Sequence, residues 1–214
     1  MERIVCLVIG YIFGLFQTGY LYGKAHHVDI RKQGSGNAGT TNALRTMGWK
    51  AGAVTFLGDC FKCVFAVVVV HLLFAKSHGD ILPLLSMYAG MGAVLGHNYP
   101  FYMHFKGGKG IAATAGLLVS TTNVWMVLIC LVSFVLIVGV TRYVSLGSLA
   151  VVIIYLIEII VYGKMGGFGM QGAHLMEMYI IAALLMLSAF YKHKENIKRL
   201  LAGTENKLSV GKNK

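Results

Sequence analysis

The sequence predicts an all-α integral membrane protein: a compact bundle of seven transmembrane helices, with the N-terminus outside and the C-terminus cytoplasmic. Three observations predict this class. Hydrophobic residues make up 57% of the 214 residues and charged residues only 13%, about half of the roughly 25% usual in soluble domains. Several apolar runs approach the ~20 residues that a helix needs to cross the hydrocarbon core. Basic residues also gather in alternate loops, as the positive-inside rule requires. We expect one membrane-embedded domain over 1–214, ending in a basic cytoplasmic tail over 192–214.

Hydropathy along the chain indicates where the helices lie. The first run is longer than the about 7–15 apolar residues of a signal peptide, and no small-residue cleavage site follows it, so we expect it to be retained. The fourth run is short and could fuse with the fifth. The seven expected spans are 4–22, 52–75, 81–103, 108–121, 124–141, 144–162 and 174–191.

The charge distribution favours keeping the fourth and fifth runs as a hairpin, turned at Thr121-Thr122-Asn123. With seven spans and an outer N-terminus, the inner loops and the tail carry 15 of the 19 Lys and Arg residues, and the outer segments carry 3. Fusing the two runs would place the basic tail outside. The hairpin therefore brings three polar segments, far apart in sequence, to the cytoplasmic face.

The first polar segment is Gly34-Ser-Gly-Asn-Ala-Gly-Thr-Thr-Asn-Ala-Leu-Arg45, which holds three glycines, five hydroxyl or amide side chains and an arginine. Exposed backbone N–H groups, hydroxyls and a guanidinium are suited to phosphate oxygens. If a helix begins near Asn37, then Asn37, Thr41 and Arg45 share one face. The alternative is a capped helix in a flexible loop. We expect a phosphate site, whose candidate residues are Ser35, Asn37, Gly39, Thr41, Asn42 and Arg45.

The second polar segment, Lys106-Gly-Gly-Lys-Gly110, could form an anion-binding turn, in which the glycines offer free N–H groups and the lysines offer charge. The alternative is a turn whose lysines anchor the helix ends by snorkelling. Its candidate substrate-binding residues are Lys106, Gly107, Gly108, Lys109 and Gly110. Ser145 opens the sixth span on the same side and is a further candidate.

The third polar segment is the tail around His193 and Asn196, which are three residues apart and can therefore point at one ligand. Glu195 would point elsewhere and could pair with Arg199. The alternative is an amphipathic basic helix on anionic lipid. Within the second span, Asp59 and Lys62 can pair at i, i+3, because a lone charge at mid-bilayer is costly.

Several site classes find no support in the sequence. Cys60-Phe-Lys-Cys63 has no second cysteine pair and is better explained as small core residues. His97 and His104 are separated by Pro100, which interrupts a shared helix face, so we expect no metal. No nucleotide-binding or nucleic-acid motif is present, and the net charge of +11 suits anionic lipid instead. No side chain stands in a known nucleophile motif, which favours direct transfer over a covalent intermediate.

Together and in order, the three segments resemble the motifs of the bacterial acyl-phosphate:glycerol-3-phosphate acyltransferases, the PlsY family. The resemblance covers essentially the whole chain and rests on 34–45, on Gly96-His-Asn-Tyr-Pro-Phe to Gly110, and on His193-Lys-Glu-Asn196. It implies a seven-helix bundle in the bacterial inner membrane, with its active site at the cytoplasmic face. Thr40, where the family often has alanine, and a long glycine-rich 163–173 loop are departures.

The resemblance also implies a reaction. A fatty acyl group passes from acyl phosphate to the 1-hydroxyl of sn-glycerol 3-phosphate, giving lysophosphatidate and inorganic phosphate, the first acylation of phospholipid synthesis. Ser35 and Arg45 would bind the glycerol phosphate, with His193, Asn196 and Ser145 as further contacts. Gly107, Gly108 and Gly110, with one of the two lysines, would bind the donor, and Glu195 would be structural.

The resemblance implies no cofactor, and it names as partners the two substrates, membrane lipid and the enzyme that makes acyl phosphate. The donor's own phosphate would act as the base, with His193 as the alternative. A membrane transporter of phosphate or organophosphate is the other function compatible with an intramembrane ion pair and an anion site. An odd span count and the lack of visible repeats argue against it.

Overall fold

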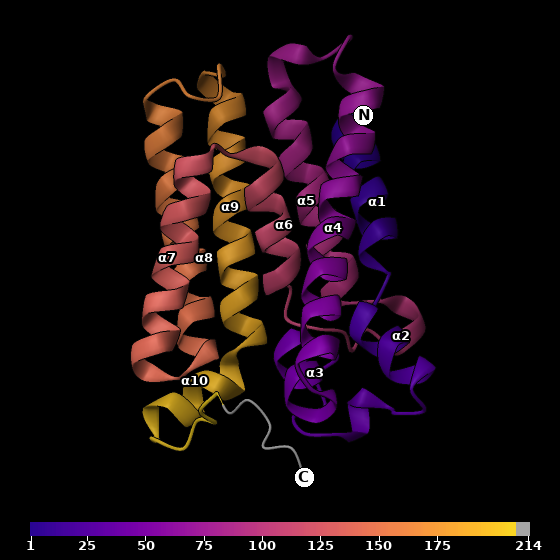
Figure 1. The fold of residues 1–214 in the computed structure, drawn as a ribbon. Helices are drawn as coiled ribbons and strands as arrows, with labels where there is room; N and C mark the ends of the chain where they lie inside the picture. Colours follow the sequence, from indigo (N-terminus) through magenta and orange to yellow (C-terminus); the bar gives the residue numbers. More distant parts are fainter. Residues whose placement is uncertain (209–214) are drawn as a thin grey trace.

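The computed structural model describes residues 1–208, all of whose regular elements are helices (Figure 1). The last six residues of the expected basic tail, 209–214, lie outside the described residues. The N-terminus and α10 lie at opposite ends of the bundle. The elements are α1 (Glu2–Gly14), α2 (Thr18–Ala25), η1 (Ile30–Lys32), α3 (Thr40–Met47), α4 (Trp49–Phe74), η2 (Gly79–Ile81), α5 (Leu82–Asn98), η3 (Phe101–Met103), α6 (Ile111–Thr121), α7 (Val124–Thr141), α8 (Val144–Lys164), α9 (Gly172–Lys192) and α10 (Lys194–Leu201).

Six segments among the described residues are long and apolar enough to cross a membrane, and they confirm the all-α membrane class. They are Glu2–Ala25, Trp49–Phe74, Gly79–Met103, Val124–Thr141, Val144–Lys164 and Gly172–Lys192. The expected fourth span is the shorter α6, whose 11 residues rise only about 16 Å at 1.5 Å each. Helix α6 ends at Thr121 and α7 begins at Val124, which confirms the turn expected at 121–123. Seven crossings, and which end faces the cytoplasm, remain predictions.

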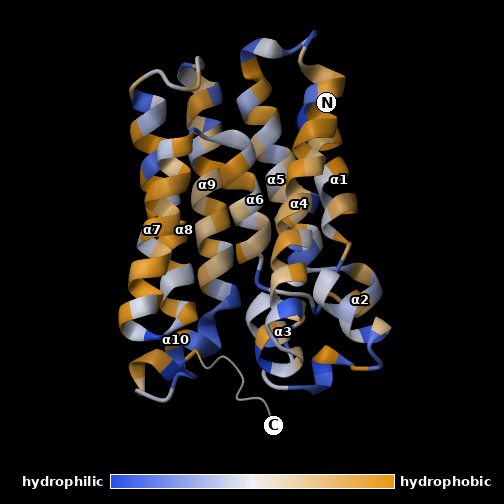
Figure 2. Ribbon diagram, viewed as in Figure 1, coloured by the Kyte–Doolittle hydropathy of each residue, from blue (hydrophilic) through white to orange (hydrophobic). Residues whose placement is uncertain are grey.

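The apolar surface of the bundle fits a lipid environment. Figure 2 shows hydrophobic residues along the helix shafts and a concentration of hydrophilic residues around α2, α3 and α10. The side chains of Leu72 and Trp125, for example, are 80% and 71% exposed on the surface of the bundle. Such side chains would be unfavourable in water over so large an area but are shielded by acyl chains.

The first expected span is not one straight helix, because α1 ends at Gly14 and α2 begins at Thr18. The interruption frees backbone carbonyls that lipid could not satisfy. Protein groups satisfy them instead: Gln17 Nε2 donates to Gly14 O over 3.2 Å, and Lys62 Nζ donates to Phe16 O over 2.7 Å. The break therefore depends on polar side chains that the apolar pattern of this run does not reveal.

Helices α1 and α5 pack backbone against backbone through small residues. A Cβ at Gly10 would lie 1.9 Å from Ala89 O, and one at Gly96 would lie 2.3 Å from Tyr11 O. Small residues four apart on each helix permit this approach, the usual solution where no hydrophobic effect drives helices together. The contact fixes the end of α5, and with it His97, beside the polar end of the bundle.

Candidate active site

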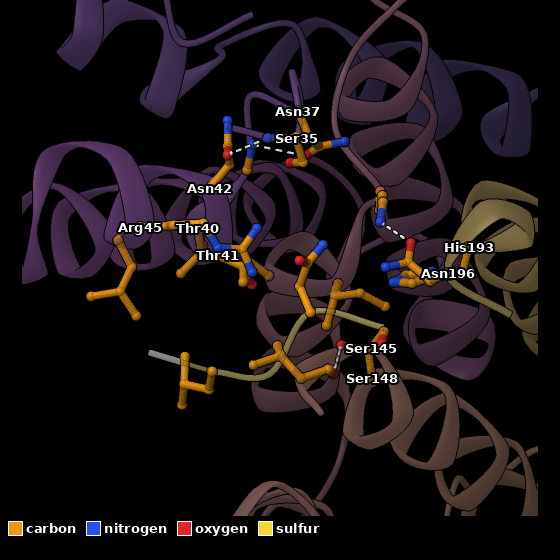
Figure 3. Close-up of a pocket in the computed structure, with 18 of the residues that line it drawn as sticks. Ser35, Asn37, Thr40, Thr41, Asn42, Arg45, Ser145, Ser148, His193 and Asn196 are labelled. Carbon is orange, nitrogen blue, oxygen red and sulfur yellow. Dashed lines mark hydrogen bonds between the residues drawn. The ribbon is translucent and has the colours of Figure 1, made fainter. Parts of the chain in front are cut away.

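A cavity of about 320 Å³ opens at the polar end of the bundle, where segments from the whole chain meet (Figure 3). This volume is at the lower end of the range typical of small-molecule sites. Its polar lining comes from the 35–45 segment, α4, the end of α5, the start of α6, the start of α8, and the α9–α10 junction with the segment after it. The polar and charged lining residues are Ser35, Asn37, Thr40, Thr41, Asn42, Arg45, Asp59, His97, Lys109, Ser145, Ser148, His193, Asn196, Arg199, Glu205 and Asn206.

The loop before α3 is held by two asparagine side chains. Asn42 Oδ1 accepts the Ser35 N–H over 2.9 Å, while Asn42 Nδ2 donates to Ile30 O and Gln33 O (Figure 3). Asn37 Oδ1 accepts the Gly39 N–H over 2.9 Å, an Asx-turn that leads into the helix. The Asn42 amide is therefore engaged in holding Ser35 in place, whereas we expected it to bind substrate directly.

Helix α3 begins at Thr40 and not near Asn37, so Asn37 does not share the helix face of Thr41 and Arg45. The Asx-turn competes with helical geometry and places Asn37 in the loop. Thr41 and Arg45 remain one turn apart on the helix, and both line the cavity with the Asn37 and Gly39 of the turn. Arg45 forms no hydrogen bond or ion pair with residues 1–208, which leaves its guanidinium available to an anion.

The turn before α6 differs from the expected nest. The N–H groups of Gly107 and Gly108 donate to Asn98 O and His97 O, over 3.2 and 3.1 Å, so they are not free. Lys106 is exposed and does not line the cavity. Lys109 and Gly110 do line it, followed by Ile111 at the start of α6, where unpaired N–H groups favour an anion. Of the two lysines, the structure places Lys109 at the site.

Lys109 is half-buried and donates to Asn196 Oδ1. The pKa of the Lys109 ammonium is lowered to about 8, mainly by burial; Glu205 raises it, and the charges of Arg199, Lys192 and Arg45 lower it. The side chain thus carries most of its charge at pH 7 and loses it at mildly alkaline pH. An incoming phosphate would stabilise the charged form.

His193 and Asn196 line the same cavity, as their spacing predicted. His193 Nδ1 lies 2.8 Å from Ala189 O, so Nδ1 carries the proton and Nε2 keeps its lone pair. Burial lowers the pKa of His193 to about 4, and the charge of Lys109 acts in the same direction. The imidazole is therefore neutral at pH 7, an acceptor for a hydroxyl but a weak base.

Glu205, from the segment after α10, was not expected at the site from the sequence. Its carboxylate accepts hydrogen bonds from Ser145 Oγ over 3.2 Å, from Asn196 Nδ2 over 2.8 Å and from Arg199 Nε over 2.8 Å. The Glu205 side chain is only 6% exposed. The expected pair of Glu195 with Arg199 was wrong: Glu195 is at the surface and pairs with Lys198 over 3.2 Å.

The expected Asp59–Lys62 pair is present, with Lys62 Nζ 2.9 Å from Asp59 Oδ1 and both side chains almost fully buried. Asp59 also accepts from Thr18 Oγ1 over 3.1 Å, and Lys62 contacts His97 Nδ1 at 2.8 Å. Asp59 and His97 line the cavity. No local pattern in the sequence connects His97 with this pair, because 35 residues separate it from Lys62.

The arrangement can hold two anions side by side. Arg45 and the start of α3 form one group of anion donors, and Lys109 with the start of α6 forms another. Among residues 1–208, no hydrogen bond joins a hydroxyl to His97 or His193, and the Ser145 hydroxyl donates to the Glu205 carboxylate over 3.2 Å. The described residues also contain no cluster of three or more His, Cys, Asp or Glu side chains able to hold a metal ion.

Comparison with known proteins gives consistent matches along the chain. The family described as "Glycerol-3-phosphate acyltransferase" matches residues 4–203. A glycerol-3-phosphate acyltransferase of Clostridioides difficile (strain 630) is 42% identical over 211 residues, covering 98% of this chain and 97% of the relative. One from Thermoanaerobacter sp. (strain X514) is 36% identical, covering 97% of this chain and 96% of the relative.

Two solved structures share the fold. The crystal structure of PlsY (YgiH), an integral membrane glycerol 3-phosphate acyltransferase, in its glycerol 3-phosphate form is 28% identical to this chain. It superposes with a TM-score of 0.82 and covers 98% of this chain and 96% of that one. The lysophosphatidic acid form of the same protein is 27% identical and gives a TM-score of 0.80, covering 98% and 97% of the two chains.

Proposed function

Because this chain belongs to the PlsY family of glycerol-3-phosphate acyltransferases, and is therefore an enzyme that makes lysophosphatidic acid, we propose that its acyl donor is a long-chain acyl phosphate. The acyl group would pass directly to the 1-hydroxyl of glycerol 3-phosphate, with release of inorganic phosphate. The observation that carries this proposal is the paired anion site: Arg45 on α3 and Lys109 before α6 line one small cavity.

Each substrate in this reaction brings one phosphate group. Of the three cationic side chains that line the cavity, Arg199 pairs with Glu205, which leaves Arg45 and Lys109, one for each phosphate. We assign glycerol 3-phosphate to Ser35 and Arg45, and the phosphate of the donor to Lys109, Gly110 and the first N–H groups of α6. Ser145, His193 and Asn196 line the same cavity and would contact the glycerol or the phosphates. Helix N-termini and guanidinium groups are both common phosphate ligands.

An acyl phosphate is already an activated mixed anhydride, so the enzyme has mainly to orient, desolvate and neutralise its substrates. Alignment of two reactants can lower a barrier by roughly 7–11 kcal/mol. The glycerol hydroxyl attacks the acyl carbonyl, the C–O bond to phosphate breaks, and the departing phosphate takes the hydroxyl proton. Lys109 and the α6 N-terminus stabilise the charge that develops on the phosphate.

We place the site at the cytoplasmic face of the bacterial inner membrane. The support is the sequence: in the expected topology, the inner loops and the tail carry 15 of the 19 Lys and Arg residues. Glycerol 3-phosphate is charged and would reach the site from the aqueous side, whereas the acyl chain would lie among the apolar lining residues Phe56, Phe134 and Val138.

The test is an assay of the purified protein with palmitoyl phosphate and radiolabelled glycerol 3-phosphate, with palmitoyl-CoA as the alternative donor. We expect lysophosphatidate and one equivalent of phosphate from palmitoyl phosphate, and no product from palmitoyl-CoA. Product from palmitoyl-CoA at a comparable rate would contradict the donor assignment. A covalently acylated protein trapped in the absence of glycerol 3-phosphate would contradict direct transfer.

A further inference from the structure

Helix α10 carries Asn196 into the cavity, but apolar packing within the protein does little to hold this helix in place. Asn196 is the only one of its eight residues that is buried. None of the three hydrophobic core clusters among residues 1–208 contains a residue of α10. A helix of eight residues is too short to be stable by itself in water, so α10 depends on its surroundings for its position.

On its inner side, α10 is held by polar contacts. Asn196 Oδ1 accepts a hydrogen bond from Lys109, and Asn196 Nδ2 donates to Glu205 Oε1 over 2.8 Å. Arg199 Nε donates to Glu205 Oε2 over 2.8 Å. All of these residues line the cavity, where water and substrate compete for the same groups. The inner side therefore provides only modest support for the helix.

The outer side of α10 has a different composition. Lys194, Lys198 and Leu201 follow one another after four and three residues, so they form one row along the helix, opposite Asn196. All three are exposed, Leu201 to 85%. Tyr191, which ends α9 with Lys192 and is 61% exposed, continues the row, because Lys194 Nζ lies 4.9 Å from the centre of its ring. We call Tyr191, Lys194, Lys198 and Leu201 the outer row.

The outer row lies at the level of the membrane surface. The candidate span Gly172–Lys192 ends two residues before α10 begins at Lys194, so the helix starts where the chain leaves the hydrocarbon. Figure 1 shows α10 across the end of the bundle, beneath α7 and α8, and Figure 2 shows that this helix includes hydrophobic residues at an otherwise hydrophilic end. Basic, apolar and aromatic side chains on one side of a helix are typical of helices that lie in the lipid headgroup region.

We propose that the outer row binds the anionic phospholipid surface from which α9 emerges, and that this contact fixes α10 and with it Asn196. Leu201 and Tyr191 enter among the first acyl-chain carbons, while the two ammonium groups contact lipid phosphates. Each basic residue near an anionic surface strengthens binding roughly fivefold. Glu195 does not cancel this attraction, because its pair with Lys198 is exposed and therefore weak. The lipid contact is independent of the acyl donor, whereas its effect on turnover rests on the proposed site.

Hydrogen exchange of the α10 amides at 197–201 tests the contact. The full chain is placed in nanodiscs of phosphatidylcholine, alone or mixed with phosphatidylglycerol. We expect exchange to be about 5- to 25-fold slower with phosphatidylglycerol, and we expect this difference to disappear in Lys194→Gln/Lys198→Gln. The matched control is Lys24→Gln/Lys32→Gln, which removes the same charge from exposed residues of α2 and η1 and should keep the full difference. Equal exchange in the two lipids, or a difference lost equally in the control, would overturn the proposal.

Insertion of the apolar part of the outer row has its own readout. A bimane at Leu201→Cys, in a cysteine-free protein, should be quenched by phospholipids brominated near the start of their acyl chains. A bimane that remains unquenched would overturn the insertion. The melting temperature of each variant is measured in the same nanodiscs.

The coupling to the site is tested by turnover with phosphatidylglycerol present. At saturating substrates, kcat of Lys194→Gln/Lys198→Gln should be about 5-fold below that of the control pair, because α10 no longer holds Asn196 in place. Equal kcat in the two double variants would overturn the coupling. If palmitoyl phosphate proves not to be the donor, the proposed function fails, while hydrogen exchange and quenching still decide the lipid contact.

Discussion

Glu205 Oε1 lies 2.8 Å from Asn196 Nδ2, so a carboxylate of the C-terminal segment engages a donor that we assign to substrate. The same carboxylate holds Ser145 and Arg199. Glu205 lies just beyond residues 4–203, the part of the chain that the family matches. In the free enzyme, a protein carboxylate thus occupies groups suited to a phosphate.

Removal of this carboxylate should favour substrate binding. We expect Glu205→Ala to lower KM for glycerol 3-phosphate about 3- to 10-fold. The substitution releases Asn196 and Arg199 from the carboxylate and removes a negative charge that would repel the phosphate. Initial rates at varied glycerol 3-phosphate measure the effect. Glu195→Ala is the control, since that carboxylate is exposed. A collapse of kcat with unchanged KM would instead indicate that Glu205 is a base.

Substitution of Arg45 should act on the acceptor. Arg45→Ala should raise KM for glycerol 3-phosphate about 10- to 100-fold, the range expected for losing a charge-assisted hydrogen bond worth roughly 1.5–3 kcal/mol. Arg45→Lys should recover part of this loss. Ser35→Ala should act in the same direction but less strongly. A larger effect on KM for palmitoyl phosphate would contradict the assignment of this end of the cavity to glycerol 3-phosphate.

The charge of Lys109 predicts an alkaline limit to activity. The pKa of this ammonium in the free enzyme is about 8, below its usual value, so the proton is lost as the pH rises through 8. We expect kcat/KM for palmitoyl phosphate to fall above this pH, whereas kcat at saturation falls less, because bound phosphate keeps the lysine charged. In Lys109→Arg the limit should disappear, since a guanidinium stays charged.

The alkaline experiment needs a correction for spontaneous hydrolysis of the donor, measured without glycerol 3-phosphate. If Lys109→Arg retained the same alkaline limit, Lys109 would not be the titrating group. The pKa of His193, about 4, predicts no loss of activity from that residue between pH 5.5 and 8.

His193 should prove to be an acceptor and not the general base. Its Nδ1 proton is committed to Ala189 O, which leaves Nε2 to accept from the glycerol. Glutamine offers an amide oxygen near the same place, so His193→Gln should keep kcat within about 10-fold. General bases contribute roughly 10²–10⁴-fold, and a loss of that size in His193→Gln would make His193 the base. His193→Ala, which lacks any acceptor, provides the comparison.

A methyl group at position 108 should impair donor use through His97. From the sequence we expected the backbone of Gly108 to contact the donor. In the structure the Gly108 N–H donates to His97 O, and its Cα faces the imidazole of His97. We expect Gly108→Ala to lower kcat/KM for palmitoyl phosphate. In the His97→Asn background the additional loss should be small, because asparagine lacks the ring atoms that the methyl group would meet. Independent losses would show that Gly108 acts otherwise.

The helices and the membrane class could be predicted because long apolar runs have few other stable structures. The break between α1 and α2 could not, since it depends on Gln17 and Lys62 satisfying the freed carbonyls. The α6 boundary was missed because the glycines before Ile111 form a turn bonded to the end of α5. Both features depend on contacts between segments that are distant in sequence, and the hydropathy of a single segment does not reveal such contacts.

The site residues were predictable where glycines, hydroxyls and basic residues cluster in one stretch, as around Arg45 and His193. His97, Asp59 and Glu205 were missed as members of the site. Each lies in a stretch with a simpler local explanation, such as a helix end, a buried ion pair or a polar tail. Only the folded chain brings them to one cavity.

The most direct test of the account asks whether the segments around Arg45 and Asn196 share one aqueous compartment. Lys50→Cys, beside α3, and Lys198→Cys, on α10, are introduced separately into a cysteine-free protein, with Lys76→Cys as the reference for the other face. A membrane-impermeant maleimide is applied to intact cells and to inverted vesicles. We predict labelling of positions 50 and 198 only in inverted vesicles, and of position 76 only in cells. Labelling of positions 50 and 198 from opposite sides would contradict a single site built from both segments.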